Sequence, residues 1–358
     1  MESQRSRRDW ADLPADLVTT IAKKASTANT EYIHLRIVCK AWRRALTPNP
    51  RHLPPQFPWL LLPRTSVDVC KLAFCDPFQS KTHYFLLPYI SDKRICGSSH
   101  GWLVLEHFWR VSLFNPITQS TIDLPAKVDP SEQKGVYCVL KAILSCNPSE
   151  DDCFVVASFL SLSSSNWKLG FCRIGDTRWT CLLMKDKQRF LMGFTCHKNI
   201  LYTLNSEMEV SVYNLRDLSV RTLPSKLYYN SLYDQVYLVE GDSKSGEPLV
   251  ALSTKNHEAT KILVHKWFDD RQQWQLVRNI GKLVLFLNQN HSINLQLEGG
   301  QGNELYCVVQ CPTDIRYFSL VINRIHLDTG KDFLQNACLT EEFGSLCGDP
   351  MWLTPSLI

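Results

Sequence analysis

The stretch GWLVLEHFWRVSLFNPITQSTIDLP, residues 101–125, decides the fold of most of the chain. A related stretch, NILYTLNSEMEVSVYNLRDLSVRTLP, occupies residues 199–224, and in both copies an aromatic-Asn pair precedes a closing Leu-Pro at the same distance. Both copies consist of short runs rich in β-branched and aromatic residues, which favour strands, separated by turn-forming residues. The repeat predicts a structural unit that stacks against further copies of itself.

Short strands of the same kind continue through the rest of residues 67–358. The segments FCRIGDTRWTCL (residues 171–182) and VHKWFDDRQQWQL (residues 264–276) each indicate a strand, a tight turn and a second strand. The alternation implies a unit of about 40 to 60 residues, the size of a four-stranded propeller blade. We therefore predict a mostly β chain in which residues 67–358 form a β-propeller of about six blades. A β-sandwich or barrel would account for the strands but not for the repeat.

The N-terminal region, residues 9–46, follows a different pattern. Its sequence, DWADLPADLVTTIAKKASTANTEYIHLRIVCKAWRRAL, places apolar residues three or four apart, as on one face of a helix. Pro14 suits the first position of a helix, and Asp16 lies where the helix dipole favours a negative charge. Helices below about 12 residues are marginal alone, so two or three of them bury too little apolar surface. This small all-α module is expected to present one half of an interface.

Two motifs in this module resemble the F-box. L-P-x-D-L occupies residues 13–17, and L-R-x-V-C-K-x-W-R occupies residues 35–43. The resemblance assigns residues 9–47 to an F-box and implies binding to a Skp-type adaptor, which joins the chain to a cullin and a ubiquitin-conjugating enzyme. On this interpretation the adaptor-binding residues are Leu13, Pro14, Leu17, Ile21, Leu35, Val38, Cys39 and Trp42. The alternative is a generic amphipathic helical pair that packs on the second domain.

Three further stretches are similar to the C-terminal β-propeller of a large plant-type F-box group, some of whose members act on protein kinases. They are GSSHGWL (residues 97–103), LFNPITQSTIDLP (residues 113–125) and PMWLTPSL (residues 350–357). The order of F-box, proline-rich segment and these motifs carries the resemblance, because single propeller motifs are loose. It implies a propeller that holds a protein substrate and leaves the identity of that substrate open.

Residues 48–66 separate the two regions. Six prolines among them predict a semi-rigid connector between the F-box and the propeller. Phe57 and residues 59–62 are too apolar to lie in water, so we expect them to dock on the propeller.

The composition is that of an ordinary globular chain, with 358 residues of which 44% are hydrophobic and 21% charged. No stretch approaches the roughly 20 apolar residues of a membrane helix, and the N-terminus lacks the apolar run of a signal peptide. The fourteen cysteines are therefore expected to be reduced, in the cytoplasm or nucleus.

The net charge of +4 comes from the first 50 residues, which hold nine Lys and Arg against five Asp and Glu. This excess would speed association with an acidic partner, or it is simply a solvated surface. Residues 1–8 form a basic tail that is too short to predict nucleic-acid binding.

The pentapeptide Gly97-Ser98-Ser99-His100-Gly101 matches the G-x-S-x-G nucleophile elbow of hydrolases. An elbow needs a strand, a turn and then a helix, whereas these residues lead into a strand at Trp102. A tight turn between strands is therefore the preferred interpretation. The cysteine spacings match no zinc site and no phosphate-binding glycine loop occurs, so we expect no metal and no cofactor.

These expectations combine into a non-catalytic adaptor. The chain is predicted to be the substrate-recognition subunit of a Skp-cullin-F-box ubiquitin ligase, with the F-box on the adaptor and the propeller on a protein substrate. Two alternatives remain: an F-box and propeller interaction module that assembles no active ligase, and a propeller hydrolase whose activity depends on Ser99.

Overall fold

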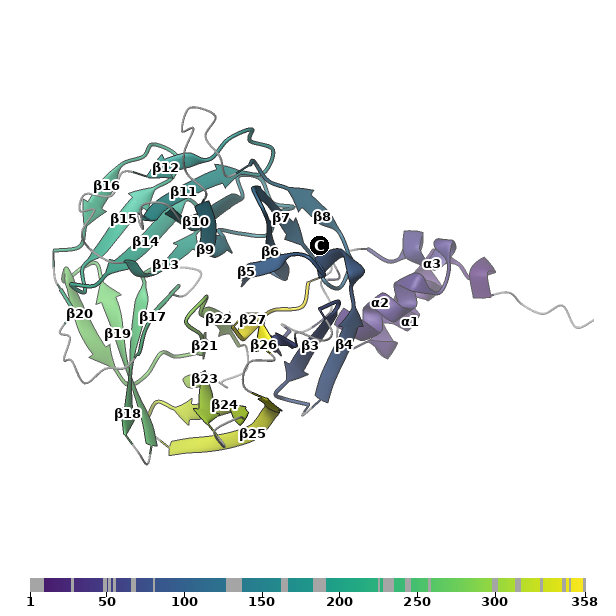
Figure 1. Cartoon of the computed structure of the whole chain (residues 1–358). Coiled ribbons are helices and arrows are strands. Elements are labelled where there is room, and N and C mark those ends of the chain that lie inside the picture. Colours follow the sequence, from purple (N-terminus) through teal and green to yellow (C-terminus); the bar gives the residue numbers. More distant parts are fainter. Residues whose placement is uncertain are drawn as a thin grey trace, which may run out of the picture.

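The computed structural model describes residues 10–26, 29–47, 50, 53, 56–65, 69–79, 81–126, 137–161, 167–182, 191–224, 226–227, 235–241, 246–256, 259–297, 302–312, 317–328, 331–342, 346–347 and 349–356. Strands arranged around a central axis make up most of the molecule, and a small group of helices lies at its edge (Figure 1). The N-terminal helices are η1 (Trp10–Asp12), α1 (Ala15–Ala25), α2 (Asn29–Ile37) and α3 (Lys40–Ala45).

Within the described residues six sheets surround the axis, which confirms the prediction of a propeller with about six blades (Figure 1). Blades two to five each hold four strands that follow the chain from the axis outward. Blade two consists of β5 (Arg94–Ser99), β6 (Trp102–His107), β7 (Arg110–Phe114) and β8 (Thr121–Asp123). Blade three consists of β9 (Tyr137–Leu144), β10 (Phe154–Ser161), β11 (Trp167–Arg173) and β12 (Thr180–Leu182). Blade four consists of β13 (Leu191–His197), β14 (Ile200–Asn205), β15 (Val210–Asn214) and β16 (Val220–Thr222). Blade five consists of β17 (Gln235–Val239), β18 (Leu249–Asn256), β19 (Ala259–Phe268) and β20 (Gln273–Val277).

Blade one joins the two ends of the propeller chain. From the axis outward it contains β27 (Met351–Leu353), β1 (Trp59–Leu61), β3 (Lys71–Asp76) and β4 (Lys81–Leu86). Leu60 of β1 pairs with Trp352 on one side and with Cys75 on the other, so β1 bridges the C-terminal strand and the rest of the blade. A small adjoining sheet pairs β2 (Arg64–Thr65) with β26 (Leu346–Cys347).

This pairing corrects the predicted connector of residues 48–66. The propeller begins at Trp59, inside that segment, because residues 59–61 are hydrogen-bonded in the sheet of blade one. Trp59, Leu60, Leu61 and Leu62 are all buried, with Leu60 completely so. The apolar run therefore does more than dock on the propeller, since it supplies one of its strands.

Blade six departs from the simple pattern. From the axis outward it contains β22 (Ile293–Gln296), β21 (Leu283–Leu287), β23 (Glu304–Pro312), β24 (Tyr317–His326) and β25 (Lys331–Glu342). β21 is antiparallel to β22 but parallel to β23, so this blade has a fifth strand and one parallel pair. The Trp352 side chain seals the join to blade one, because its indole stacks edge-on against Phe286 and donates a hydrogen bond to the Leu287 carbonyl at 3.1 Å.

The sequence repeat corresponds to the same part of blades two and four. Residues 101–125 and 199–224 each supply the three outer strands of their blade, and the conserved aromatic-Asn pair ends the third strand. The Asn115 amide N–H donates to the Ser120 carbonyl at 3.0 Å, and that of Asn214 donates to the Ser219 carbonyl at 2.9 Å. The repeat therefore encodes one particular turn, closed by an asparagine whose side chain also accepts backbone N–H groups in both blades.

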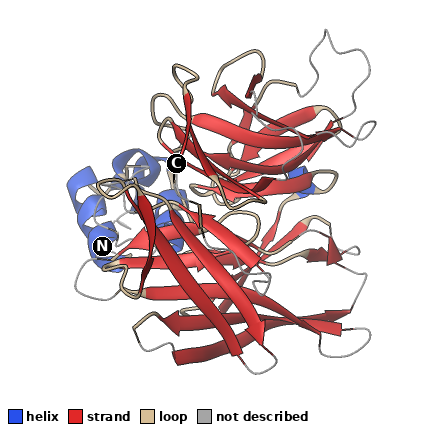
Figure 2. Cartoon of the chain, turned by 90° about the vertical axis from the view of Figure 1, so that its left-hand side faces the viewer, coloured by secondary structure: helices blue, strands red, loops and turns tan. Residues whose placement is uncertain are grey.

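The two faces of the ring differ in what they carry. We call the face at which the innermost strands begin the entry face, and the face at which they end the exit face. Because strands alternate in direction, the β6–β7 turn lies on the entry face, while the β5–β6 and β7–β8 turns lie on the exit face. Figure 2 shows the helices and the C-terminal end of the chain on the same side of the ring, which is the exit side.

Candidate adaptor-binding and substrate-binding surfaces

The N-terminal helices share a core of their own. Val18 and Ala22 lie one helical turn apart on α1 and face inward, where they meet Tyr32, Trp42 and Leu46. Each of these five side chains is at most 4% exposed. The Cys39 side chain caps α3 by accepting the Trp42 amide N–H at 3.5 Å. The module is therefore folded around these five buried side chains, and further apolar residues pack at the margin of this core.

The structure divides the eight predicted adaptor-binding residues into three groups. Leu17 on α1 and Val38 between α2 and α3 are 47% and 53% exposed, and Pro14 is exposed as well. Four others are half-buried and pack at the margin of the helical core: Leu13, Ile21, Leu35 and Cys39. Trp42 lies inside the core at 4% exposure, so it positions α3 and offers a partner no surface of its own.

Trp10 is a residue that the sequence pattern does not single out. Its ring is 66% exposed, and its carbonyl accepts the Trp42 indole N–H at 2.8 Å. The same bond fixes η1 against α3. A tryptophan three residues before the start of the L-P-x-D-L motif was the available signal, but no periodicity marks it because it precedes α1. The exposed apolar surface of the module therefore includes Trp10 beside Leu17 and Val38 as candidates for contact with a partner.

The helices are attached to the propeller at the β7–β8 turn of blade two. Ile117 packs against the helical core and also against the core between blades one and two. The turn is held in shape by Asn115, which is fully buried and whose side-chain oxygen accepts the N–H groups of Ile117 and Thr118, each at 3.0 Å. The Asn115 side-chain amide also donates to the Ser356 carbonyl in the C-terminal tail at 3.1 Å. One apolar side chain on a rigid turn thus sets where the helices sit.

We expect Ile117→Ala to loosen this attachment. Loss of the half-buried side chain removes about 1 to 2 kcal/mol of docking free energy, which lowers the ratio of docked to undocked helices roughly 5- to 30-fold. Hydrogen exchange of α1 and of the β7–β8 turn should rise together in this variant. Arg216→Ala at the corresponding turn of blade four is the matched control and should leave both unchanged. Equal exchange in the two variants would contradict the attachment.

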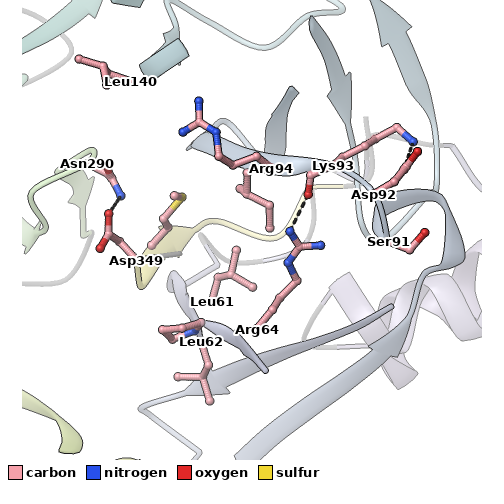
Figure 3. Close-up of a pocket in the computed structure, with 13 residues that line it drawn as sticks. Leu61, Leu62, Arg64, Ser91, Asp92, Lys93, Arg94, Leu140, Asn290 and Asp349 are labelled. Atoms are coloured by element: carbon pink, nitrogen blue, oxygen red, sulfur yellow. Dashed lines mark hydrogen bonds and ion pairs between the residues drawn. The ribbon is translucent and has the colours of Figure 1, made fainter. Parts of the chain in front are cut away.

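A pocket opens on the entry face, on the opposite side of the ring from Ile117. Its volume is about 420 Å³, within the usual range of ligand pockets. Figure 3 shows side chains from the start of β5, from the end of β1 and from the approach to β27 converging on it. Apolar lining comes from Leu61, Leu62, Ile95, Leu140 and Met351. The pocket is therefore built where the chain ends of blade one meet the innermost strands of blades two and three.

The basic residues of the pocket wall are already engaged. The Arg64 guanidinium donates to the carbonyls of Ile90 at 2.8 Å and Lys93 at 2.5 Å, which ties β2 to the loop before β5. Arg94 forms an ion pair with the buried Glu106, whose other carboxylate oxygen accepts the Val139 amide N–H at 2.9 Å. These two arginines hold the blades together. They are not free anion-binding groups.

Two carboxylates and the paired Arg94 are the exposed charged groups that line the pocket. Asp92 and Asp349 are both exposed, and Asn290 donates to Asp349 at 3.4 Å. The bond from the Lys93 ammonium keeps the pKa of Asp92 below its ordinary value. Leu140 lies among these groups as an exposed apolar side chain in the wall of the pocket (Figure 3). The mouth thus combines an exposed apolar side chain with exposed carboxylates.

Further along the axis the side chains carry little charge. His291 reaches across to β5, where its Nδ1 lies 2.9 Å from the Ser98 carbonyl. Burial lowers the pKa of His291 to about 3, assisted by the charge of Lys141, so the imidazole is neutral and donates this bond. Burial likewise lowers the pKa of Lys141 to about 7, and its Nζ lies 4.8 Å from the centroid of the Phe194 ring. Burial therefore shifts both groups toward their neutral forms.

An aromatic rim, defined here as Tyr89, Phe108 and Trp109, borders the mouth on blades one and two. Phe108 and Trp109 form the β6–β7 turn and are 73% and 57% exposed, while Tyr89 is 40% exposed in η2 (Pro88–Ile90). Phe108 packs against His107 with ring centroids 4.4 Å apart. Exposed aromatic side chains grouped on one face mark an interaction site more often than scattered single ones do.

Charged side chains connect the rim to the pocket. His107 Nε2 lies 3.2 Å from the carboxylate of Asp92, which lines the pocket. Lys93 joins Asp92 at 2.9 Å and extends over the Tyr89 ring, with its Nζ 4.1 Å from the centroid. The rim and the mouth therefore form one continuous surface on the entry face. The signal for it in the sequence was a Phe-Trp pair in a turn, where polar residues are usual.

The pentapeptide at residues 97–101 lies in a strand–turn–strand setting. Gly97, Ser98 and Ser99 belong to β5, and His100-Gly101 form the turn into β6. Gly101 has a φ of +83°, and a side chain there would meet the Ser356 Cβ at 2.2 Å, so glycine is required. The Ser99 hydroxyl is 3% exposed and donates to the Leu144 carbonyl at 3.2 Å. No helix follows the turn, so the backbone amides of a nucleophile elbow are not formed at Ser99.

Two further features of the described residues concern metal binding and membrane insertion. Across these ranges no three or more His, Cys, Asp or Glu side chains are grouped so that they would hold a metal ion. None of the helices within the same ranges is long and apolar enough to cross a membrane.

Comparison with known proteins shows the family to which the propeller is similar. The model of the KIB1-4 β-propeller matches residues 73–331. F-box protein At4g00893 of Arabidopsis thaliana is 27% identical over 199 residues, which are 54% of this chain and 46% of that protein. Putative F-box protein At4g22660 of the same plant is 29% identical over 152 residues, 40% of this chain and 37% of that protein. The chain thus matches less than half the length of these two relatives.

Among solved structures, TolB from Acinetobacter baumannii aligns with 88% of this chain and 71% of its own, with a TM-score of 0.45 and 11% identity. The match to the family model, unlike this structural likeness, shows the family. It extends from β3 to the start of β25 and covers more than half of the 358 residues. The chain therefore belongs to the KIB1-4 β-propeller family, as a plant-type F-box protein with a propeller domain.

Proposed function

We propose that this chain is the substrate-recognition subunit of a Skp-cullin-F-box ubiquitin ligase. The observation that carries the proposal is the pairing of an F-box module, which leaves Leu17 and Val38 exposed, with a propeller that presents a separate surface. Relatives that match the propeller are named F-box proteins, which supports the same pairing. In this role the chain supplies two binding surfaces, and the transfer of ubiquitin belongs to its partners.

The arrangement of the two surfaces suits that role. The helices pack at the exit side through Ile117, whereas the aromatic rim and the pocket lie on the entry face. A protein held at the entry face would not compete for space with an adaptor on the helices. The fixed turn at Asn115 would then hold the substrate at a constant distance from the adaptor, and through it from the ubiquitin-conjugating enzyme that supplies the ubiquitin.

We further propose that the rim binds the substrate. Trp, Tyr and Phe dominate the energetics of protein interfaces because they bury large areas with few rotatable bonds. Phe108 and Trp109 are the most exposed aromatic side chains of the described propeller apart from Tyr84, and they border the pocket. The substrate would be a folded protein or segment that covers these rings with apolar side chains and places one side chain in the pocket.

The proposal places the complex in the cytoplasm or nucleus. Eleven cysteines of the described ranges are free thiols, among them the exposed Cys181. Thiols of this number persist in reducing compartments, where the ubiquitin machinery also acts.

The test uses three full-length variants expressed in plant cells, with proximity labelling under proteasome inhibition. Phe108→Ser with Trp109→Ser should lose the labelled substrates about tenfold or more while it retains the adaptor. Leu17→Asp with Val38→Asp should retain the substrates but lose the adaptor and cullin, and the substrates should lose their ubiquitin. Leu218→Ser with Leu276→Ser removes similarly exposed side chains from blades four and five and should match the wild type.

Each part of the proposal fails on a different result. If the rim variant labels the same proteins as the wild type, the substrate surface lies elsewhere. If substrates keep their ubiquitin and half-life in the Leu17 and Val38 variant, the ligase assignment is wrong, and the chain is an interaction module.

A further inference from the structure

Two cysteines face one another across the turn between β9 and β10. Leu144 pairs with Val155 in the antiparallel ladder, so the register places Cys146 directly opposite Cys153. The intervening pair is closed by hydrogen bonds, because Ser145 N–H donates to the Phe154 carbonyl and Phe154 N–H donates to the Ser145 hydroxyl, both at 2.9 Å. Cys146 and Cys153 thus occupy the next, non-hydrogen-bonded position. Opposite residues there have Cα atoms about 4.5 Å apart, which a disulfide spans without movement of the backbone.

The two thiols are already in contact. The Cys153 thiol donates to the Cys146 carbonyl at 3.2 Å, and the Ser145 hydroxyl donates to the Cys146 sulfur at 3.8 Å. A hydrogen bond from the Cys153 thiol lowers the pKa of Cys146, against the opposing effects of burial and of the carboxylates of Glu150 and Asp152. The same contact and burial raise the pKa of Cys153. One thiol of the pair is therefore favoured as the thiolate, and its neighbour retains the proton.

Solvent exposure distinguishes Cys146 and Cys153 from the other cysteines. Cys146 is half-buried at the exit face, while Cys153 beneath it is 2% exposed. Cys172 and Cys196 are buried, and burial raises the pKa of each. Cys181 is exposed, but it is paired in the sheet with Gly170, so no thiol stands opposite it. Among the described cysteines, the turn of blade three alone combines an accessible thiol with a second thiol directly across the strand pair.

We propose that Cys146 and Cys153 form a peroxide-oxidised thiol pair, in which Cys146 reacts first and Cys153 closes a disulfide. The Cys146 thiolate attacks one oxygen of hydrogen peroxide, so that an S–O bond forms, the O–O bond breaks and hydroxide leaves. The Cys153 sulfur then attacks the sulfenic sulfur, so that the S–S bond forms and the S–O bond breaks. The departing hydroxide takes up the Cys153 proton as water. Two thiols lose two electrons in total, and one peroxide becomes two waters.

The disulfide would fix the β9–β10 turn of blade three, which lies at the exit face beside blade two. Leu144, two residues before Cys146, accepts the Ser99 hydroxyl bond that ties β5 to β9. A covalent link across the turn would hold this corner of the exit face closed. The modification would therefore stabilise the propeller on the side where the helices attach, and it leaves the entry face unchanged.

The sequence makes the test direct. Trypsin releases residues 142–168 as one peptide whose cysteines are Cys146 and Cys153 alone, and Asp151 and Asp152 lie between them. The folded full-length protein is treated with stoichiometric hydrogen peroxide and then denatured, its free thiols are blocked with N-ethylmaleimide, and the masses of the tryptic peptides are measured. We expect the mass of this peptide to fall by two hydrogens and the peptide to carry no N-ethylmaleimide. Its two halves should stay joined after the backbone is cleaved before Asp151.

Three variants complete the experiment. Cys153→Ser should stop at a sulfenic acid on Cys146 that dimedone traps, and Cys146→Ser should leave Cys153 fully labelled. Cys181→Ser removes an exposed thiol elsewhere and should not change the disulfide yield. The proposal is overturned if the peptide carries two labels while Cys181 is oxidised, or if Cys146→Ser leaves the rate of peroxide consumption unchanged.

Discussion

A chain that begins at residue 64 should fail to fold, whereas a chain that begins at residue 56 should form a stable propeller. The longer fragment retains β1, and the shorter one loses it. Without β1 the C-terminal strand β27 has no neighbour, because Leu60 connects Trp352 to Cys75. The ring would then be open between blade six and the rest of blade one.

The size of the effect follows from burial. Trp59, Leu60, Leu61 and Leu62 are at most 7% exposed, and each contributes roughly 1.5 to 3 kcal/mol when buried. Their loss removes about 6 to 12 kcal/mol, which is comparable to the whole stability of an ordinary domain. Trp59 also stacks on His83 of β4, with centroids 4.5 Å apart, so the loss reaches the outer strand of the blade.

Thermal unfolding followed by circular dichroism is the measurement. The fragment from residue 56 should unfold in one cooperative transition near that of the full-length protein, and the fragment from residue 64 should aggregate or melt without a transition. Trp59→Ala in the longer fragment is an intermediate case and should lower the transition temperature. Equal stability of the two fragments would show that β1 is not a structural strand.

The sequence predicted the propeller because a propeller repeats a local unit. The Asn115 and Asn214 turns depend on side-chain bonds to residues two or three positions away, so the pattern is visible within each copy. The role of Trp59 in β1 was missed because its partner Leu353 is almost 300 residues further along the chain. Six prolines nearby favoured a connector, and only the pairing with β27 shows that the apolar run is a strand.

The binding surfaces were predicted less completely than the fold. The F-box motifs identified residues of the correct module, but periodicity alone does not separate the inward face of a short helix from the outward one. Val18 directly follows Leu17, and Trp42 lies in the same motif as Val38, yet only packing assigns Val18 and Trp42 to the core. The aromatic rim was missed because the sequence does not show whether Phe108 and Trp109, which lie between two predicted strands, face solvent or the core. Their exposure depends on the turn between β6 and β7, which the tertiary structure fixes.

Leu17→Asp with Val38→Asp should abolish binding to a Skp-type adaptor and leave the protein folded. Both side chains are about half exposed, so the substitutions add charge to the surface without disturbing the core around Val18 and Trp42. In a complex these side chains would be desolvated, and a buried carboxylate without a partner costs several kcal/mol at each site. We expect a fall in affinity of at least a hundredfold, measured by titration of full-length protein with the adaptor.

A Leu13→Ala and Pro14→Ala variant would be less informative, because Leu13 packs at the margin of the helical core and its loss would weaken the module itself. Leu276→Asp is the matched control, since its side chain is 50% exposed on β20 of blade five, and its affinity for the adaptor should equal that of the wild type. Unchanged melting of all three proteins would confirm that the fold is intact. If the double variant still binds the adaptor as the wild type does, then the helices present a different face to it, and the half-buried Ile21 and Leu35 become the next residues to exchange.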